Sequence, residues 1–341
     1  MQTGTAFIET PRKILVVIFD GALLLNVAGP IEAFSLANRE LDARRGGSGG
    51  HARYQTILAS PAGGPIRTSS DIELNTLSLP DPVSGSFDTI ALVGGMGMRA
   101  MSENRQLIDW LRAAAPRARR IASFGSAAFM MARAGLLNGK RCSAHWRIAD
   151  NLRNQFPLVE VETEALFVRD GHVLTAAGSI ASIDLALNMI EEDHGKALAL
   201  MVARVLVMPR MRPGDQPQLS AELRAQTAAT PRVATAAEWI VTNIDRRPTV
   251  ASLADRFAMS ERNFSRVFTK EMGMSPQRFI ESARLEAARR WLAGSSLPID
   301  SIARRSGYSS GEHFAQSFKK TLGTTPGDYR REAHQRAGEP H

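Results

Sequence analysis

The chain has 341 residues, 44% of them hydrophobic and 22% charged, a composition typical of a globular protein long enough for two domains. Its single cysteine, Cys142, excludes an intrachain disulfide and a cysteine-based metal site, and we expect neither a metal nor a cofactor. No apolar run approaches the roughly 20 residues that cross a bilayer, and the first residues lack a signal-peptide pattern. We therefore expect a cytoplasmic protein with no membrane partner.

The basic charge is concentrated in the last third of the chain. Residues 232–341 hold 18 Lys and Arg against 12 Asp and Glu, a net charge of +6 out of the total of +8. Residues 1–231 supply the remaining +2. Such an excess favours an acidic partner, although a solvated basic surface would give the same count.

The first 208 residues alternate between β-branched apolar runs and amphipathic runs. Lys13–Phe19 (KILVVIF) has the pattern of a strand buried on both faces. Strands that alternate with helices predict a doubly wound, flavodoxin-like α/β domain with a parallel sheet. We leave residues 71–79 unassigned and expect a loop at 44–50. The other expected strands are 54–59, 87–93, 120–124 and a hairpin of 165–169 with 172–176, and the expected helices are 31–41, 103–115, 125–134, 180–194 and 196–207.

Small and polar residues follow three of these strands. They are Asn26, Gly95 within the run Gly94–Gly97, and the pair Gly125 and Ser126. Ligands of doubly wound sheets bind at the carboxyl ends of the strands, where backbone amides at glycine turns suit an anion or a carbonyl oxygen. Taken together these residues predict a pocket, whereas any one glycine alone is explained by a tight turn.

Several stretches of this domain resemble the PfpI-like, glutamine-amidotransferase-like superfamily. They are NVAGPIEAF at 26–34, LVGGMG at 92–97, IASFGSAAFMMARAGLLNGKRCSAHW at 121–146 and TAAGSIASIDLALNMIEEDHG at 175–195. The resemblance places the family's nucleophilic cysteine at Gly125 and its assisting acid at Asn26. Of the three reactive positions only His145 keeps its residue type, and Cys142 lies after the helix.

Glycine offers neither a thiolate nor a hydroxyl, so covalent catalysis is not expected at this position. Ser126 lies beside the elbow but away from its reactive direction, and Asn26 is a poor base. We therefore expect a catalytically inactive domain that binds a small metabolite. His145 is either a structural hydrogen-bonding residue or a ligand contact. The ligand-pocket candidates are Asn26, Gly95, Gly125, Ser126 and His145.

Two similar helical units follow a proline-rich and glutamine-rich segment at 209–231, which we expect to be an exposed linker with one helical turn near 221–225. Ser260–Gly273 and Ser309–Gly323 each begin with serine, end with glycine and carry two phenylalanines four residues apart. A short amphipathic run precedes each, at 250–258 and 299–306. This is the helix-turn-helix pattern. A long helix at 277–293 separates the two units.

Residues 232–332 resemble the AraC/XylS family of transcription regulators, most closely in GYSSGEHFAQSFKKTLGTTPGDYR at 307–330. Together with the first domain, the resemblance is to GlxA-like regulators. It implies three parts: residues 1–208 for ligand sensing and dimerisation, 209–231 as linker, and 232–335 for DNA binding. Two reading helices would then enter successive major grooves of double-stranded DNA roughly 34 Å apart.

The resemblance places the reading residues on the exposed faces of two helices. Arg262 is expected to contact a base, and Arg266 either a base or a phosphate. Glu312 would be repelled by phosphate unless it meets cytosine, so the second unit is expected to read less sequence. The base-contact candidates are Arg262, Ser265, Arg266, Glu312 and Gln316, and the phosphate-contact candidates are Lys270, Arg305, Lys319 and Lys320.

The leading hypothesis is a regulator of transcription that acts on promoter DNA in the cytoplasm, associated with the nucleoid. One alternative is an amidase or hydratase fused to a DNA-binding module. Another is a first domain used only for dimerisation. A homodimer is implied by the resemblance alone, and RNA polymerase is a further hypothetical partner.

Overall fold

The computed structural model describes residues 10–44, 54–83, 85–228 and 230–335. The chain divides into two compact units, Met1–Gln218 and Leu219–His341. The division falls inside the segment expected to be a linker. Within the described ranges, no helix combines the length and apolarity that a membrane span requires.

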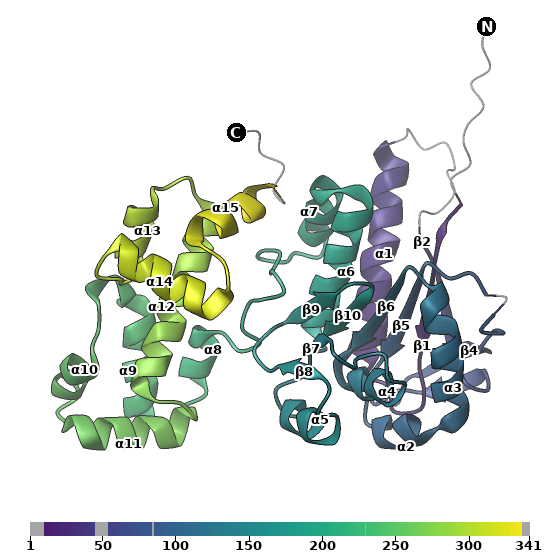
Figure 1. The fold of residues 1–341 in the computed structure, drawn as a ribbon, viewed down its shortest axis with the longest axis horizontal. Helices are drawn as coiled ribbons and strands as arrows, with labels where there is room; N and C mark the ends of the chain where they lie inside the picture. Colours follow the sequence, from purple (N-terminus) through teal and green to yellow (C-terminus); the bar gives the residue numbers. More distant parts are fainter. Residues whose placement is uncertain (1–9, 45–53, 84, 229, 336–341) are drawn as a thin grey trace, which may run out of the picture. The chain divides into compact units, whose positions relative to one another are not determined.

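The N-terminal unit is built on an eight-stranded sheet with the order β3-β4-β2-β1-β5-β6-β10-β9 (Figure 1). Strands β4, β2, β1, β5, β6 and β10 run parallel, and the edge strands β3 and β9 are antiparallel to their neighbours. This confirms the predicted doubly wound sheet. The strands are β1 (Arg12–Val17), β2 (Tyr54–Ser60), β3 (Gly64–Arg67), β4 (Glu73–Ser78), β5 (Thr89–Val93), β6 (Arg120–Phe124), β9 (Phe167–Asp170) and β10 (Val173–Ala176), and a separate pair is formed by β7 (Arg141–Ser143) and β8 (Glu160–Glu162).

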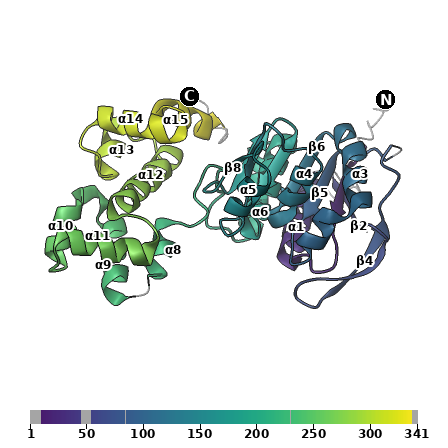
Figure 2. The ribbon, with the colours of Figure 1, turned by 60° about the horizontal axis from the view of Figure 1, so that its bottom comes forward.

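Helices cover both faces of the sheet (Figures 1 and 2). Alternate residues of the first strand enter different cores, Ile14 and Val16 on one side and Leu15 and Val17 on the other. A strand buried on both faces has no polar positions, which is why residues 14–17 of β1 are continuously apolar. One face carries α1 (Leu24–Arg44), α6 (Ile180–His194) and α7 (Lys196–Val205), and the other carries α2 (Met98–Glu103), α3 (Arg105–Ala114), η1 (Ala115–Arg117), η2 (Gly125–Ala127), α4 (Ala128–Arg133) and α5 (Ala149–Gln155).

The first helix begins earlier than predicted. It starts at Leu24 rather than at residue 31, so Pro30 lies inside it. The missing amide of this proline removes only one helical hydrogen bond, and the start is fixed by the Leu23 amide, which donates to the Gly94 carbonyl oxygen at 3.0 Å. Elements of three to seven residues (β3, β7, β8, α2 and α5) are too short for their periodicity to be recognised. The loop expected at 44–50 lies outside the described residues apart from Arg44.

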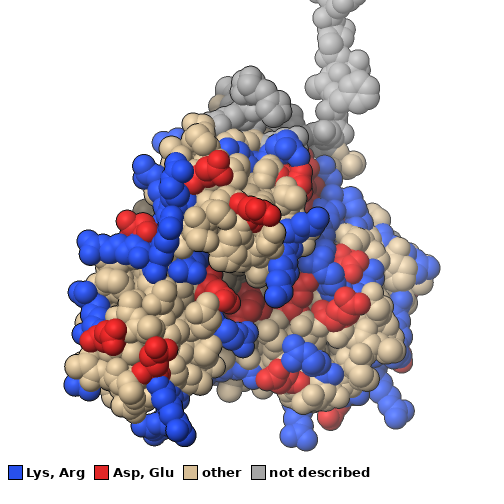
Figure 3. All heavy atoms as spheres, turned by 60° about the vertical axis from the view of Figure 1, so that its left-hand side comes forward, with Lys and Arg blue, Asp and Glu red and all other residues tan. Residues whose placement is uncertain are grey.

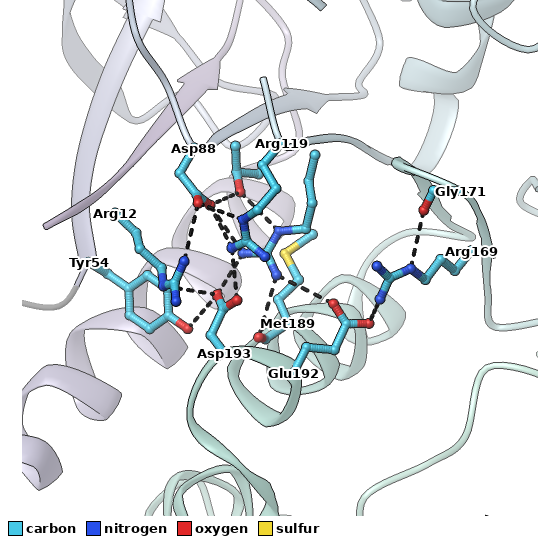
Figure 4. A network of polar contacts seen from close by, with 11 residues as sticks. Arg12, Tyr54, Asp88, Arg119, Arg169, Gly171, Met189, Glu192 and Asp193 are labelled. Atoms are coloured by element: carbon cyan, nitrogen blue, oxygen red, sulfur yellow. Dashed lines mark hydrogen bonds and ion pairs between the residues drawn. The ribbon is translucent and has the colours of Figure 1, made fainter. Parts of the chain in front are cut away.

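A charged network lies at the amino ends of the central strands (Figure 4). Arg120 at the start of β6 and Asp193 near the end of α6 are each 1% exposed and form an ion pair of 2.8 Å. Arg119 bridges Asp193 and Asp88 at 2.8 and 2.7 Å, and the Tyr54 hydroxyl donates to Asp193 at 3.0 Å. Burial raises the pKa of Asp88, but the hydrogen bonds from Arg119 and Thr89 outweigh it and hold the pKa below its usual value. The network ties the last turn of α6 to three strands.

The segment after α7 differs from the exposed linker that its composition predicts. Arg212 forms a bidentate ion pair with Asp184, whose side chain is fully buried in α6. The Gly214 carbonyl oxygen accepts from the amides of Leu166 and Phe167. Gln218 donates through its amide nitrogen to the carbonyl oxygens of three residues at 2.8–3.0 Å, namely Ala144, Thr163 and Ala165. Residues 212–218 are thus an ordered strap on the N-terminal unit, because Arg212, Gly214 and Gln218 all find partners there.

The C-terminal unit is entirely helical in its described residues, as predicted. Two hydrophobic cores lie along α12 (Pro276–Gly294), which crosses between them (Figure 2). Phe279 and Ile280 in its first half belong to one core, and Ala288 and Leu292 in its second half belong to the other. The first core contains α8 (Ala221–Gln226), α9 (Pro231–Thr242), η3 (Ile244–Arg246), α10 (Val250–Arg256) and α11 (Glu261–Met272), and the second contains α13 (Ile299–Arg305), α14 (Gly311–Leu322) and α15 (Pro326–Gln335).

Replacing Asp193 by asparagine is expected to lower the free energy of unfolding of the N-terminal unit by about 3 kcal/mol, because it leaves the buried Arg120 without its nearest anion. The matched control is Asp109→Asn, which breaks the exposed pair with Arg112 and should change stability by less than about 0.5 kcal/mol. Urea denaturation of both variants checks this. Equal effects would show that the buried network contributes no more than a surface pair.

Candidate nucleic-acid interface and ligand site

The second helices of the two helix-turn-helix units have the same length and the same types of cap. Helices α11 and α14 are each twelve residues long and are capped by Ser260 and Ser310, whose hydroxyls accept from backbone amides three residues ahead. Each helix ends at a left-handed glycine, Gly273 or Gly323. These caps satisfy backbone groups at both ends of each helix. They confirm the predicted boundaries of α11, whereas the cap of α14 is Ser310 rather than the predicted Ser309.

The paired phenylalanines set which face of each helix is turned inward. Phe264 and Phe268 in α11 are 2% and 0% exposed, and Phe314 and Phe318 in α14 are both fully buried. They are core residues, as predicted. The opposite face of each helix is therefore free to meet a partner. Four of the five expected base-contact residues on these faces are exposed: Arg262, Arg266, Glu312 and Gln316. The fifth, Ser265, is half-buried.

Charge differs sharply between the two faces. Positions fifty residues apart correspond, so Arg262 and Arg266 of α11 are matched by Glu312 and Gln316 of α14. The Arg266 guanidinium donates to the Asn263 side chain at 2.9 Å, and the Gln316 amide donates to Glu312 at 3.3 Å. The first helix thus presents two cations where the second presents an anion and an amide.

A second carboxylate lies beside the start of α14. A Cβ added to Gly311 would lie only 2.0 Å from the Asp300 Oδ1. Glycine therefore allows Asp300 of α13 to approach the helix, where a larger residue would exclude it. Together with Glu312, this acidic pair makes the start of the second reading helix unfavourable for a phosphate.

The expected phosphate contacts Lys270, Arg305, Lys319 and Lys320 are exposed. Lys270 lies in the last turn of α11, and Lys319 and Lys320 lie in the last turn of α14. The Arg305 guanidinium lies over the Trp291 ring, 5.1 Å from its centroid. Figure 3 shows basic side chains spread over the face of the C-terminal unit turned forward, with acidic side chains between them.

The turn of the second unit joins the two halves of the helical domain. Gly307 has φ +81°, and a Cβ there would lie 2.2 Å from the Ile244 carbonyl oxygen in η3. Arg284 in the middle of α12 donates to the Pro248 carbonyl oxygen at 3.2 Å. The Gly307 contact places the turn of the second helix-turn-helix unit against η3, and the Arg284 bond ties α12 to the segment before α10.

In the N-terminal unit, the structure brings Asn26 and Gly125 together. Gly125 has φ +69°, and a Cβ there would lie 3.1 Å from the Asn26 Nδ2. Asn26 is fully buried, and its Oδ1 accepts from the Ser179 amide at 2.5 Å and from the Ser182 hydroxyl at 3.2 Å. Its Nδ2 has no hydrogen-bond partner among the described residues. The sharp elbow is retained although its side chain is absent.

Ser126 and Gly95 form a second close pair. The Gly95 amide donates to the Ser126 hydroxyl at 3.0 Å. This bond ties the end of β5 to the turn after β6. Because the hydroxyl is engaged with the neighbouring loop, Ser126 is held away from the position of a nucleophile.

His145 and Cys142 lie in the segment after α4. The His145 ring stacks on Trp146 at 5.5 Å, and its Nδ1 accepts from the Arg147 amide at 3.2 Å. Burial and the charge of Arg147 lower its pKa, which favours the neutral ring. Its recorded contacts lie within its own loop rather than with Asn26 or Ser126. Cys142 is buried, and this burial raises the pKa of its thiol to about 12, so it is unsuited to be a nucleophile.

Two surface hollows of this unit are lined by residues other than those at the elbow. One of about 350 Å³ is lined by Met96, Gly97, Arg99, Ala100 and Glu103, next to Gly95. Another of about 630 Å³ lies between α3 and α4. Neither is lined by Asn26, Gly125, Ser126 or His145.

Sequence reasoning missed several residues of these sites. Gly178, Ser179 and Ser182 complete the surroundings of Asn26, and Ser179 has an unusual φ of +52°. Their only sequence signal is the run TAAGSIAS, in which glycine and serine follow a strand. Gln218 and Asp300 carry no local signal, since their partners are far away in sequence or lie across a turn.

Gly307→Ala is expected to destabilise the C-terminal unit by about 3 kcal/mol or more, since it adds a backbone clash to left-handed strain. Gly323→Ala is the matched control. Gly323 has φ +73° but nothing within 4 Å of the added Cβ, so only about 1–2 kcal/mol of strain is expected. Scanning calorimetry of the full chain compares them. If both variants lost a similar amount of stability, the backbone at Gly307 would not be tightly packed against Ile244.

The chain matches known families in both units. Residues 12–192 match the DJ-1/PfpI family, and residues 253–332 match a helix-turn-helix domain. The HTH-type transcriptional regulator GbdR of Pseudomonas aeruginosa is 26% identical over 323 residues, covering 94% of this chain and 85% of that protein. The HTH-type transcriptional regulator GlxA of Rhizobium meliloti is 29% identical over 282 residues, covering 83% and 86%.

Two further matches concern the N-terminal unit. Isonitrile hydratase of Pseudomonas putida is 34% identical over 140 residues, covering 40% of this chain and 59% of that protein. The crystal structure of a ThiJ/PfpI family protein from Pseudomonas syringae has a TM-score of 0.52 at 20% identity, covering 74% of this chain and 92% of that one, and shows the fold alone. The chain therefore belongs to the DJ-1/PfpI family and joins a domain of that family to an AraC-type helix-turn-helix domain.

Proposed function

We propose that this protein is a transcription regulator that binds double-stranded DNA in a sequence-specific way. The main support for this proposal is the exposed face of α11, where Arg262 and Arg266 lie on a rigid helix that is capped at both ends. Arginine forms bidentate contacts with guanine. Relatives that align with most of the chain are named as transcriptional regulators, which supports the same function.

The two helix-turn-helix units contribute unequally to DNA binding. The first reading helix supplies cations for bases, whereas the second offers Glu312 with Asp300 nearby. Lys319 and Lys320 lie at the far end of the second helix, where they reach phosphates. The first helix-turn-helix unit therefore sets most of the sequence preference. The second mainly adds affinity for DNA and fixes the position of the protein along the duplex.

Selection from a pool of random-sequence duplexes tests this. The wild type should enrich one motif. Arg262→Ala should lose about 1–3 kcal/mol of discrimination at one position of it. Lys319→Ala is the control: it should enrich the same motif, weaken binding to all sequences alike and reduce the salt slope by about 1. Failure of the wild type to enrich any motif would refute sequence-specific reading.

For the N-terminal unit we propose ligand binding without catalysis. The elbow holds glycine at residue 125, the nearby hydroxyl of Ser126 is bonded to Gly95, and the thiol of Cys142 is buried. Within the described ranges, the Asn26 Nδ2 beside the elbow has no hydrogen-bond partner. These features support a site that binds a small metabolite and lacks a nucleophile.

The chain is anchored by hydrogen bonds within each unit on either side of the boundary at residues 218 and 219. Gln218 accepts from the Trp146 amide at 3.0 Å, next to His145. Three residues further on, the Ala221 amide donates to Glu286, which is 3% exposed on α12.

An amidase or hydratase fused to a DNA-binding module is the competing function, favoured by the match to isonitrile hydratase. It requires Ser126 as the nucleophile. We expect no turnover of amides or isonitriles by the purified protein. Turnover that disappears in Ser126→Ala, with Ser123→Ala as the control for a nearby buried serine, would contradict the proposal.

We further propose that the protein works as a homodimer in the cytoplasm, at the nucleoid. Two copies would present two pairs of reading helices to one promoter site. The remaining alternative for the N-terminal unit is that it serves only for dimerisation and binds no ligand. A contact with RNA polymerase would follow from binding at a promoter.

A further inference from the structure

Each helix-turn-helix unit carries an arginine that is stacked on a tryptophan. The Arg256 guanidinium carbon lies 4.5 Å from the centroid of the Trp239 ring, and the Arg305 guanidinium carbon lies 5.1 Å from the centroid of the Trp291 ring. Both distances are within the roughly 6 Å at which a cation is attracted to an aromatic face. The sequence predicted a phosphate contact for Arg305 but none for Arg256.

The two stacked pairs occupy the same place in the two units. Arg256 is the last residue of α10 and Arg305 is the last residue of α13, and these are the first helices of the two units. In both helices, the residues two and three positions before the arginine are buried. Each tryptophan comes from the preceding α-helix, Trp239 from α9 and Trp291 from α12. The same contact is thus built twice from different parts of the chain.

Each arginine is exposed, whereas the tryptophan beneath it is half-buried. Trp239 packs against the first core of the C-terminal unit, and Trp291 packs against the second. Among the described residues, neither guanidinium has a recorded carboxylate partner. Two cations are therefore held on flat surfaces that the cores fix in place. An arginine held in this way loses less side-chain entropy when it binds an anion.

These arginines lie where a DNA backbone would pass. The first helix of a helix-turn-helix crosses the backbone, and the start of the second helix enters the major groove. Arg256 comes just before the turn that leads to Ser260, the cap of α11, and Arg305 comes just before the turn that leads to Ser310, the cap of α14. Each guanidinium is therefore placed beside the entry of a reading helix, at the edge of the groove that it would occupy.

We infer that Arg256 and Arg305 are a matched pair of contacts to DNA phosphates, and that Trp239 and Trp291 are the positioning residues that orient them. We call each arginine with its tryptophan a phosphate clamp. This rests on the proposed DNA-binding function and names contacts to the DNA backbone that serve it. The clamps carry no sequence information themselves, because every base pair has the same phosphates. They fix each unit on the duplex, so that its reading helix meets the bases in one register.

The first test measures binding of the full-length protein to a labelled duplex of random sequence by fluorescence anisotropy, at several salt concentrations. Arg256→Ala and Arg305→Ala should each weaken binding and reduce the salt slope by about 1, since each removes one phosphate contact. Arg290→Ala is the matched control. The Arg290 guanidinium already pairs with Glu222 at 2.6 Å, so its loss should leave the slope unchanged. An unchanged slope in either of the first two variants would overturn the matched pair.

The second test separates positioning from folding by a double-mutant cycle. Trp239→Leu should weaken binding about two- to fivefold in the wild-type background, because the flat support of Arg256 is lost. It should have no further effect in Arg256→Ala, where no guanidinium remains to be oriented. Trp239→Phe keeps an aromatic face and should retain most of the affinity. Equal weakening by Trp239→Leu in both backgrounds would assign the tryptophan a structural role and overturn the clamp.

Failure of the clamps and failure of sequence-specific reading give different results. The salt slope on random DNA reports the phosphate contacts, whereas enrichment of a motif reports the reading of bases. A wild type that enriches no motif would refute sequence-specific reading and leave the comparison of slopes intact. Arg256→Ala should enrich the same motif as the wild type, and enrichment of a different motif would show that Arg256 contacts bases instead.

Discussion

The long helix α12 is the element on which the DNA-binding unit depends. Neither half of this unit has a core of its own without it, because Phe279 and Leu292 on the same helix belong to different cores. Full burial of such side chains contributes about 1.5–3 kcal/mol each. A rigid helix buried at both ends fixes the separation of the two reading helices, and the contacts of Arg284 and Gly307 near its middle fix their relative rotation.

A comparable constraint shapes the N-terminal unit. Its central strands are buried on both faces, so polar chemistry is confined to the two ends of the sheet. The amino end carries the network around Arg120 and Asp193, where every charge recorded has an opposite partner. The carboxyl end carries neutral groups, among them the Asn26 Nδ2, which has no hydrogen-bond partner in the described part of the chain. The charged arrangement at the amino end holds the fold together.

Much of this organisation could be predicted from the sequence. Continuous apolar runs marked the buried strands, and the phenylalanine pairs with serine and glycine caps gave α11 and α14 almost to the residue. The start of α1 was missed because Pro30 suggests a helix start, whereas tertiary contacts of Leu23 and Asn26 extend the helix beyond it. The pairing of Arg120 with Asp193 joins residues 73 positions apart, and no local pattern contains that information.

The strap shows why composition alone misjudged one segment. Proline, glutamine and glycine at 209–218 are typical of a linker, yet here Gln218 donates to three carbonyl oxygens of the N-terminal unit. Gln218 uses both ends of its amide, donating to three carbonyl oxygens and accepting from Trp146. Only Leu219 and Ser220 lie between this anchor and Ala221, whose amide donates to Glu286 within the C-terminal unit. Composition shows which residues a segment contains but not which acceptors lie within reach of them, so a linker and an ordered strap look alike in the sequence.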